Sequence, residues 1–252
     1  MGMGFGSARV MAGYGAKIAL FDFSETVFET AESLNKDGYE ALAFKIDVRD
    51  GAGLKDACEK VAEHYGKIDI LVNAAGIGVL KYFLDATEEF RDLNLDINYK
   101  GTWNACQAVI PYMLKRKYGK IVNYCSVTGC LVVDPGMTSY AATKGAILAF
   151  TKALAVEFAA SNITVNAILP GMIDTPMTDK SCREASPKDP QSVKDSIAAN
   201  IPMKRLGTIE EAGKVTAFLA SDESSYVTGA SIVFDGGSTL PENPGSGWTP
   251  QA

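Results

Sequence analysis

The stretch "MGMGFGSARVMAGYGAKIALFDF" (residues 1–23) decides the fold. Gly2 and Gly4 precede an amphipathic helical pattern, and the apolar run "KIALFD" (17–22) follows as a short strand that ends in Asp22. Glycines at the start of a helix let the backbone approach a pyrophosphate, which the N-terminus of the helix can then bind. The order of loop, helix, strand and acid therefore predicts the latter half of a dinucleotide-binding turn.

A turn of this kind normally follows a β-strand, and no strand precedes Gly2 in this sequence. In a doubly wound sheet that first strand would lie between the strands that end here at Asp22 and Asn73. Its loss would remove ladder hydrogen bonds and about four aliphatic side chains, or roughly 6–12 kcal/mol. We therefore expect the natural protein to begin roughly 15–20 residues earlier. If the shorter chain is real, we expect badly weakened cofactor binding.

Downstream, short apolar runs alternate with helical patterns as far as about residue 235. The predicted strands cover 17–22, 40–47, 68–76, 120–126, 163–171 and 230–237, and the third of them runs into a turn of small residues. The predicted helices cover 24–37, with Ser24 as its cap, 50–65, 87–98, 100–117, 138–160 and 208–221. Continuous apolar strands that alternate with helices form a parallel sheet covered on both faces. The sequence predicts a single, doubly wound α/β domain of the Rossmann type over residues 1–238, with the first strand absent.

Two stretches interrupt this alternation. Residues 172–200 are polar and punctuated by prolines, which predicts a mobile flap beside a ligand site. Residues 239–252 are rich in proline and glycine, and they predict an irregular C-terminal tail.

The composition argues against several classes of function. The net charge is −6, and no basic cluster exceeds "KRK" (115–117), which argues against nucleic acid and anionic membranes as partners. The five cysteines are scattered without a CxxC pair, and His64 is the only histidine, so we expect no metal site, disulfide framework or Ser-His-Asp triad. Without a signal peptide or a long apolar run, the sequence predicts a soluble cytoplasmic protein.

Residues suited to proton transfer lie in the middle of the chain. The motif "YAATK" places Tyr140 and Lys144 on one face of a helix, and Ser126 ends a strand, where α/β sheets place their chemistry. Asn98 lies at a junction between predicted helices. A free tyrosine, with a pKa of about 10, is a poor base at pH 7, but a nearby ammonium group favours the phenolate. Together these residues suit hydride transfer to a carbonyl, in which tyrosine supplies the proton, serine holds the substrate oxygen and asparagine supports a water path to the lysine.

Asp22 indicates which dinucleotide is preferred. An acid at the end of this strand can accept both ribose hydroxyls of adenosine and would repel a 2′-phosphate. Met1 and Phe23 supply no cation for that phosphate. The sequence therefore predicts NAD in preference to NADP. A purely structural role, as an acid near a helix N-terminus beside Ser24, stays open.

Several motifs in a fixed order resemble the short-chain dehydrogenase/reductase family of the single-domain type, from Gly2 to Gly237. They are "NAAG" (73–76), Asn98, Ser126, "YAATK" (140–144) and "LPG…T" (169–175). The stretches "SVTGCLVVDPGMTSYAATK", "KDPQSV" and "LASDESSYVTGASIVFDGGSTLPE" resemble more narrowly the UcpA-like branch of bacterial oxidoreductases. The family pattern T-G-x-x-x-G-x-G is retained only as its final G-x-G.

The resemblance implies a role for each matching residue. Ser126, Tyr140 and Lys144 would be catalytic, with Asn98 as the fourth member. The cofactor would contact Tyr140 and Lys144 and the residues Gly2, Gly4, Asp22, Asp47, Val48, Asn73, Gly76, Pro170, Gly171 and Thr175. Of these, Asp47 and Val48 would flank the adenine, and the last three would meet the nicotinamide half. The family also implies a homotetramer with contact faces on the helices at 100–117 and 138–160.

The leading hypothesis is an NAD-dependent oxidoreductase that acts on a secondary alcohol or ketone. A nucleotide-binding or scaffold protein without turnover is the alternative. The missing strand before Gly2 favours that alternative. The complete set of Asn98, Ser126, Tyr140 and Lys144 opposes it. A sugar-nucleotide epimerase or dehydratase of the extended type would need a longer chain for its substrate domain.

Overall fold

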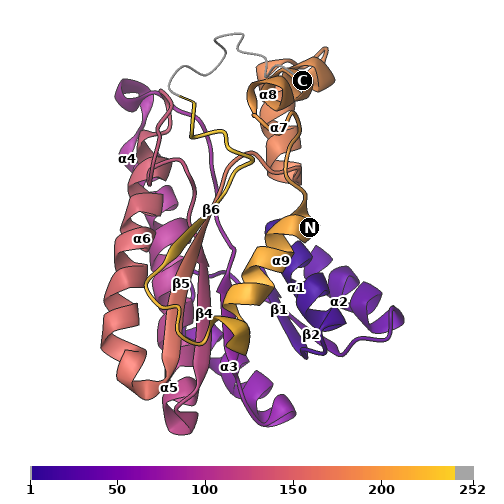
Figure 1. The fold of residues 1–252 in the computed structure, drawn as a ribbon, viewed down its shortest axis with the longest axis vertical. Helices are drawn as coiled ribbons and strands as arrows, with labels where there is room; N and C mark the ends of the chain where they lie inside the picture. Colours follow the sequence, from indigo (N-terminus) through magenta and orange to yellow (C-terminus); the bar gives the residue numbers. More distant parts are fainter. Residues whose placement is uncertain (1, 242–252) are drawn as a thin grey trace.

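A computed structural model describes residues 2–241 as parallel strands flanked by helices (Figure 1). In chain order the strands are β1 (Ile18–Asp22), β2 (Ala41–Lys45), β3 (Ile70–Asn73), β4 (Gly119–Tyr124), β5 (Ile163–Pro170) and β6 (Ser231–Phe234). The α-helices are α1 (Met3–Gly13), α2 (Thr26–Lys36), α3 (Gly51–Tyr65), α4 (Glu88–Asn94), α5 (Gly101–Arg116), α6 (Thr138–Phe158), α7 (Pro176–Ala185), α8 (Pro190–Asn200) and α9 (Ile209–Leu219). A π-helix, η2 (Leu95–Lys100), joins α4 to α5. Short 3₁₀ turns are η1 (Phe83–Asp85), η3 (Ala159–Ser161) and η4 (Asp222–Ser224).

The strands form two parallel sheets. One sheet pairs β1 with β2, and the other has the order β3-β4-β5-β6. Within the described residues β1 and β3 do not pair, and in Figure 1 the indigo β1–β2 pair lies to the right of the larger sheet. Strands β4 and β5 are buried at every residue, as continuous apolar runs in a covered parallel sheet should be. The predicted α/β class and parallel pairing are confirmed, with the sheet divided between β1 and β3.

Helix α1 is held against α9 by close backbone contact. A β-carbon on Gly6 would lie 2.1 Å from the Ile209 carbonyl oxygen. A buried chain of hydroxyl groups adds to this contact. The Tyr124 hydroxyl, on β4, lies 2.8 Å from Ser7 Oγ of α1 and 2.8 Å from Thr216 Oγ1 of α9. These contacts fix the N-terminus of α1 relative to the larger sheet.

A second buried polar chain crosses the larger sheet to α6. The fully buried Asn123 accepts a hydrogen bond from the Asn73 side chain at 2.8 Å and donates one to Thr151 Oγ1 at 2.9 Å. Paired in this way, the buried amides avoid the cost of unsatisfied polar groups. These hydrogen bonds link β3, β4 and α6. The predicted site residues lie at the carboxyl ends of the two strands and at the amino end of the helix.

Residues 172–200, the stretch predicted as a flap, contain α7 and α8. Each helix is capped by a side chain, Thr175 and Asp189, with proline in the first turn. Helix α2 begins at Thr26, two residues later than predicted, with Glu25 at the N-cap position. The Ser24 hydroxyl nevertheless accepts a hydrogen bond from the Thr26 N–H at 3.2 Å. Of the predicted tail, residues 242–252 lie outside the described part of the chain. Within residues 2–241 no helix is long and apolar enough to cross a membrane.

Candidate active site

Ser126, Tyr140 and Lys144 come together through the turn that follows β4. Ser126 lies just after this strand and is 8% exposed, whereas the other two residues belong to the first two turns of α6. The turn packs directly on α6, since a β-carbon on Gly129 would lie 2.3 Å from the Ala141 carbonyl oxygen. Gly129 has φ of +89°, a conformation that glycine adopts without strain. The serine is thereby fixed beside the helix that carries the tyrosine.

Lys144 places a buried ammonium group next to the Tyr140 ring. The lysine is 5% exposed, and its Nζ donates a 2.7 Å hydrogen bond to the Tyr124 carbonyl oxygen. The same Nζ lies 5.5 Å from the centroid of the Tyr140 ring, within the range of a cation–π contact. The tyrosine itself is partly exposed. The Tyr140 hydroxyl can therefore contact a ligand, and a fixed cation, the Lys144 ammonium, lies beside its ring.

Asn98 is fully buried in the π-helix η2 and holds the loop after β3. Its Oδ1 accepts from the Ile77 N–H at 2.8 Å, and its Nδ2 donates to the Ile77 carbonyl at 3.0 Å and to Thr143 Oγ1 at 3.0 Å. Thr143 in turn donates to the Tyr140 carbonyl at 2.7 Å. The asparagine therefore ties the loop after β3 to the turn of α6 that bears Tyr140. A π-turn at such a position is a frequent feature of functional sites.

The N-terminus of α1 has the geometry of a phosphate site. Gly2 caps this helix with φ of +104°, and no described atom lies within 4 Å of a β-carbon added there. Gly4 packs on the loop after β3, because its β-carbon would lie 3.2 Å from Ala74 Cβ. The first N–H groups of an α-helix lack partners within the helix. Together with the open space at Gly2, they fit a bound pyrophosphate.

The two acids predicted for the adenosine half lie beyond β1 and β2. Asp22, at the end of β1, is exposed and accepts a 2.9 Å hydrogen bond from the Ser24 N–H. Asp47 is bound by the guanidinium of Arg49, with Nε 2.9 Å from Oδ2, and this contact lowers the pKa of Asp47 below its usual range. Val48 packs on Gly101, since a β-carbon there would lie 2.6 Å from Val48 Cγ2.

The remaining predicted residues lie in the loops after β3 and β5. Gly76 leaves little room for a side chain, because its β-carbon would lie 3.1 Å from Asn98 Oδ1. The Pro170 carbonyl accepts a hydrogen bond from the Val127 N–H at 3.1 Å, which joins β5 to the turn that contains Ser126. The Gly171 N–H donates to the Phe234 carbonyl at 2.9 Å. The Thr175 side chain caps α7. Asn73, in contrast, uses its amide to join β3 to β4.

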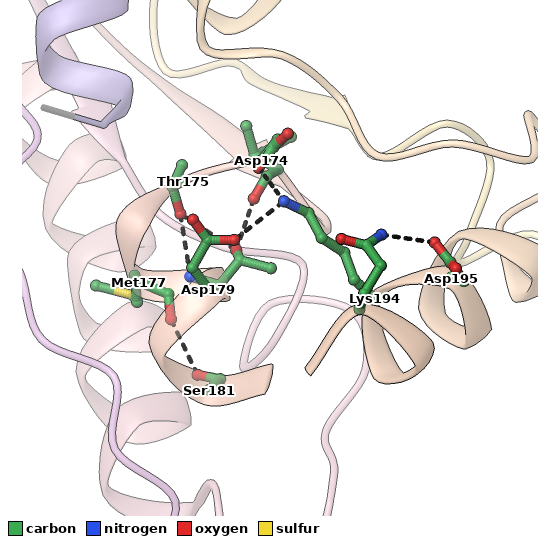
Figure 2. A network of polar contacts seen from close by, with 10 residues as sticks. Asp174, Thr175, Met177, Asp179, Ser181, Lys194 and Asp195 are labelled. Carbon is green, nitrogen blue, oxygen red and sulfur yellow. Dashed lines mark hydrogen bonds and ion pairs between the residues drawn. The ribbon is translucent and has the colours of Figure 1, made fainter. Parts of the chain in front are cut away.

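An ion-pair network holds the flap over residues 172–200 (Figure 2). The Lys194 ammonium, on α8, lies 2.6 Å from Asp174 Oδ1 and 3.0 Å from Asp179 Oδ1. The two carboxylates raise the pKa of Lys194, so the lysine stays charged at neutral pH. One cation thus fixes α8 to α7 and to the loop that contains Thr175. The spacing of these residues along the chain gave no sign of this network.

Sequence reasoning also missed three groups that support the site. The Tyr124 carbonyl receives the Lys144 ammonium, Thr143 bridges Asn98 to Tyr140, and Gly78 lies against the tyrosine ring, with a β-carbon position 3.3 Å from Tyr140 Cε2. Of the three, only Thr143 could have been found from the sequence, because it lies inside the motif "YAATK". The contacts of the other two depend on how distant segments pack.

A parallel α/β sheet, a helix N-terminus capped by glycine and a tyrosine beside a buried lysine on α6 are typical of nucleotide-dependent oxidoreductases of the doubly wound class. The chain belongs to the short-chain dehydrogenase/reductase family, whose members use nicotinamide cofactors. A family model described as "Enoyl-(Acyl carrier protein) reductase" matches residues 1–239.

Individual relatives cover nearly the whole chain. Oxidoreductase UcpA of Salmonella typhimurium is 51% identical over 96% of this chain and 92% of its own length. The 3-oxoacyl-[acyl-carrier-protein] reductase FabG of Thermotoga maritima is 42% identical over 94% of this chain and 93% of its own. The crystal structure of levodione reductase matches with a TM-score of 0.89 and 31% identity, over 94% and 93% of the two chains. The predicted family and its UcpA-like resemblance are confirmed.

Proposed function

We propose that this chain is an NAD-dependent oxidoreductase that interconverts a secondary alcohol and a ketone. The observation that carries the proposal is the Lys144 ammonium, which is buried, hydrogen-bonded to Tyr124 and placed beside the Tyr140 ring. Bound nicotinamide would supply or accept the hydride. The protein must then supply and remove the proton of the hydroxyl group, and this arrangement suits that task.

Tyr140 and Ser126 would act on the substrate oxygen. In reduction the Tyr140 hydroxyl would donate its proton to the oxygen as that oxygen becomes an alcohol, and Lys144 would stabilise the phenolate left behind. Ser126 Oγ already accepts from the Thr128 N–H at 3.1 Å, so its own proton is available for the substrate oxygen. We propose that Asn98 positions the site through Ile77 and Thr143 and thereby supports proton supply to Lys144.

The cofactor residues support NAD in preference to NADP. Asp22 presents an exposed carboxylate at the end of β1, where it could accept ribose hydroxyls and repel a 2′-phosphate. Arg49, a cation in the loop after β2, is already paired with Asp47. We propose that Gly2 and Gly4 lie against the pyrophosphate, that Asp47 and Val48 flank the adenine, and that Asn73 and Gly76 shape the cleft. We assign Pro170, Gly171 and Thr175 to the nicotinamide half.

Asp22→Ala is expected to shift the cofactor preference towards NADP. Loss of the carboxylate removes two acceptors for NAD and the repulsion of a 2′-phosphate, so the ratio of kcat/KM for NAD to that for NADP should fall about tenfold or more. Steady-state kinetics with each cofactor measure this ratio. Glu25→Gln, which removes a nearby acid paired with Lys45, is the matched control and should leave the ratio unchanged. An unaltered ratio in Asp22→Ala would refute the assignment.

Exposed apolar side chains near Tyr140 support a substrate with an apolar group. Tyr82, Phe83 and Leu84 are exposed, as are the residues 131–133. The two loops meet through the Lys81 N–H, which donates to the Gly136 carbonyl at 2.9 Å. The sulfur of Met177 lies 3.6 Å from the β-carbon position of Gly78, which also touches the tyrosine ring. We propose that the apolar part of the substrate packs on these surfaces.

Lys194→Met is expected to raise KM for the carbonyl or alcohol substrate about three- to tenfold, with a smaller change in kcat. The substitution keeps an unbranched side chain of nearly the same length and removes the cation that links Asp174 to Asp179, so the flap loses its fixed position. Lys188→Met, in the exposed loop between α7 and α8, is the control. Equal KM values for wild type and Lys194→Met would show that the network does not order the flap for substrate.

Two further features support proposals on assembly and location. On α5 and α6, Trp103 is 45% exposed and stacks on Phe150 at 5.1 Å, and Val156 is 83% exposed. These apolar surfaces support a homotetramer with α5 and α6 as contact faces. All five cysteines are free thiols, which supports a reducing, cytoplasmic environment.

The proposed activity is tested by a panel of secondary alcohols with NAD and of ketones with NADH, followed by the absorbance of NADH. We expect turnover with at least one pair, and faster turnover for substrates with larger apolar groups. Calorimetric titration with NAD provides the second readout. NAD binding with no turnover across the panel would favour the alternative, a nucleotide-binding protein without catalysis.

A further inference from the structure

Tyr124, the last residue of β4, carries a hydroxyl group into an apolar cluster that joins the sheet to α1 and α9. The tyrosine is buried there together with Met11, Ile168 and Leu219. A phenyl ring alone would fill the same space. A buried hydroxyl group lowers stability unless it is hydrogen-bonded, so packing alone does not account for a tyrosine at this place.

The Tyr124 hydroxyl is bound by two other buried hydroxyl groups. Its oxygen lies 2.8 Å from Ser7 Oγ, on α1, and 2.8 Å from Thr216 Oγ1, on α9. Ser7 Oγ also donates to the Met3 carbonyl, in the first turn of α1, at 3.0 Å. The three protons suffice for a continuous series in which Thr216 donates to Tyr124 and Tyr124 donates to Ser7. This series ends at Met3, the residue next to the Gly2 cap.

The main chain of Tyr124 contacts the other half of the site. Its carbonyl oxygen accepts the 2.7 Å hydrogen bond from the Lys144 ammonium. A buried side chain in a close-packed cluster stays in one rotamer, so the hydroxyl and carbonyl oxygens of this residue keep a fixed separation. One residue therefore connects the first turn of α1 to the lysine that we assign to catalysis.

We propose that Tyr124 is a positioning residue, which holds the phosphate-binding end of α1 in register with Lys144 through its hydrogen bond to Ser7. The inference rests on the proposed function, because it takes the N-terminus of α1 as the pyrophosphate site. Helical N–H groups bind an anion well only when they point at it together, so a tilt of the first turn weakens the binding of phosphate. The adenosine half, beyond β1 and β2, does not use this contact.

Tyr124→Phe tests the inference, because it removes the hydroxyl group and keeps the ring in the cluster. We expect the dissociation constants for NAD and for ADP both to rise about three- to tenfold, the effect of one lost hydrogen bond. The dissociation constant for adenosine, which has no phosphate, should change less than about twofold. Calorimetry measures NAD and ADP, and ligand-observed NMR measures adenosine. An equal loss for all three ligands, or no loss for NAD and ADP, would overturn the proposal.

Turnover provides a second readout, which a general loss of structure would not reproduce. KM for NAD should rise by the same factor as the dissociation constant, and kcat should stay within about twofold of wild type. The reason is that the Tyr124 carbonyl, a main-chain group, still holds Lys144 in the variant. A fall in kcat with KM for NAD unchanged would contradict the role in cofactor binding.

Two variants of the partner hydroxyl groups test the path. Ser7→Ala breaks the same hydrogen bond from α1, so it should match Tyr124→Phe, and the double variant should bind NAD no more weakly than either single variant. Thr216→Val is the matched control. It removes the other hydrogen bond of the Tyr124 hydroxyl and leaves the one to Ser7, so the affinity for NAD should stay within about twofold of wild type. Losses that multiply in the double variant, or a Thr216→Val variant as weak as Tyr124→Phe, would overturn the proposal.

Binding and turnover also separate this inference from the proposed function. A wild-type chain that binds NAD but turns over no substrate of the panel would count against the proposed function, and the ligand comparison would still decide the role of Tyr124. A wild-type chain that binds neither NAD nor ADP would overturn both.

Discussion

Tyr140→Phe is expected to lower kcat/KM by about 10²–10⁴-fold, the range in which general acid–base catalysis contributes. The substitution removes the single hydroxyl group and leaves the ring in place against Gly78 and the Lys144 ammonium. Without that hydroxyl, the substrate oxygen has no proton donor backed by a buried cation. The loss corresponds to about 3–5 kcal/mol of transition-state stabilisation. Steady-state kinetics with the best substrate of the panel measure it.

Cofactor affinity separates a catalytic loss from a structural one. Calorimetric titration should give a dissociation constant for NAD close to that of wild type, because the phenyl ring keeps the shape of the site. Tyr226→Phe, at a fully exposed tyrosine, is the matched control and should retain full activity. If Tyr140→Phe turned over substrate at the wild-type rate, Tyr140 could not be the proton donor.

The class of the fold could be predicted because its strands carry a local signal. The runs around β4 and β5 are apolar along their whole length, and the structure buries every residue of both strands. Boundaries were less accurate where the chain leaves a sheet. The stretch 68–76 was predicted as a strand that runs into a turn of small residues, but the point where the strand ends, Asn73, could not be predicted. Alternation along the chain predicts strands, but it does not state which strand edges meet.

The candidate site could be predicted in its residue types more than in its contacts. The spacing of Tyr140 and Lys144 placed them on one helix face, and the structure puts the ammonium 5.5 Å from the ring centroid. The partners of Asn98 could not be predicted, because Ile77 and Thr143 come from a loop and a helix far along the chain. The cofactor and substrate roles of all these residues stay predictions.

The prolines of residues 172–200 carry a local signal for helices. Pro176 and Pro190 each follow a capping side chain, Thr175 and Asp189. Proline in the first turn of a helix loses no hydrogen bond, because the N–H groups there lack helical partners. A cap followed by proline therefore indicates the start of a helix. The Lys194 network has no comparable local signal, since it joins two helices.

Gly6→Ala is expected to lower the free energy of unfolding by about 3 kcal/mol, the upper end of the usual cost of overpacking. The new methyl group would lie 2.1 Å from the Ile209 carbonyl oxygen, and a backbone atom cannot rotate away. Gly213, on α9, faces the same contact, with a β-carbon position 2.5 Å from the Gly6 carbonyl oxygen. Helices α1 and α9 must therefore separate. For a domain of this size we expect the Tm to fall by about 6–12 °C.

Gly13→Ala is the matched control, because it makes the same substitution at the last residue of the same helix. Its nearest neighbour would be the Tyr39 hydroxyl at 3.8 Å, an ordinary contact, so the variant should be as stable as wild type or slightly more stable. Thermal unfolding of both variants decides whether the α1–α9 contact limits stability. Equal Tm values would show that the helices adjust freely. A shift of α1 would also move Gly4, whose β-carbon position lies 3.2 Å from Ala74 Cβ at the N-terminus of the helix. Gly6→Ala should therefore also weaken NAD binding, and Gly13→Ala should not.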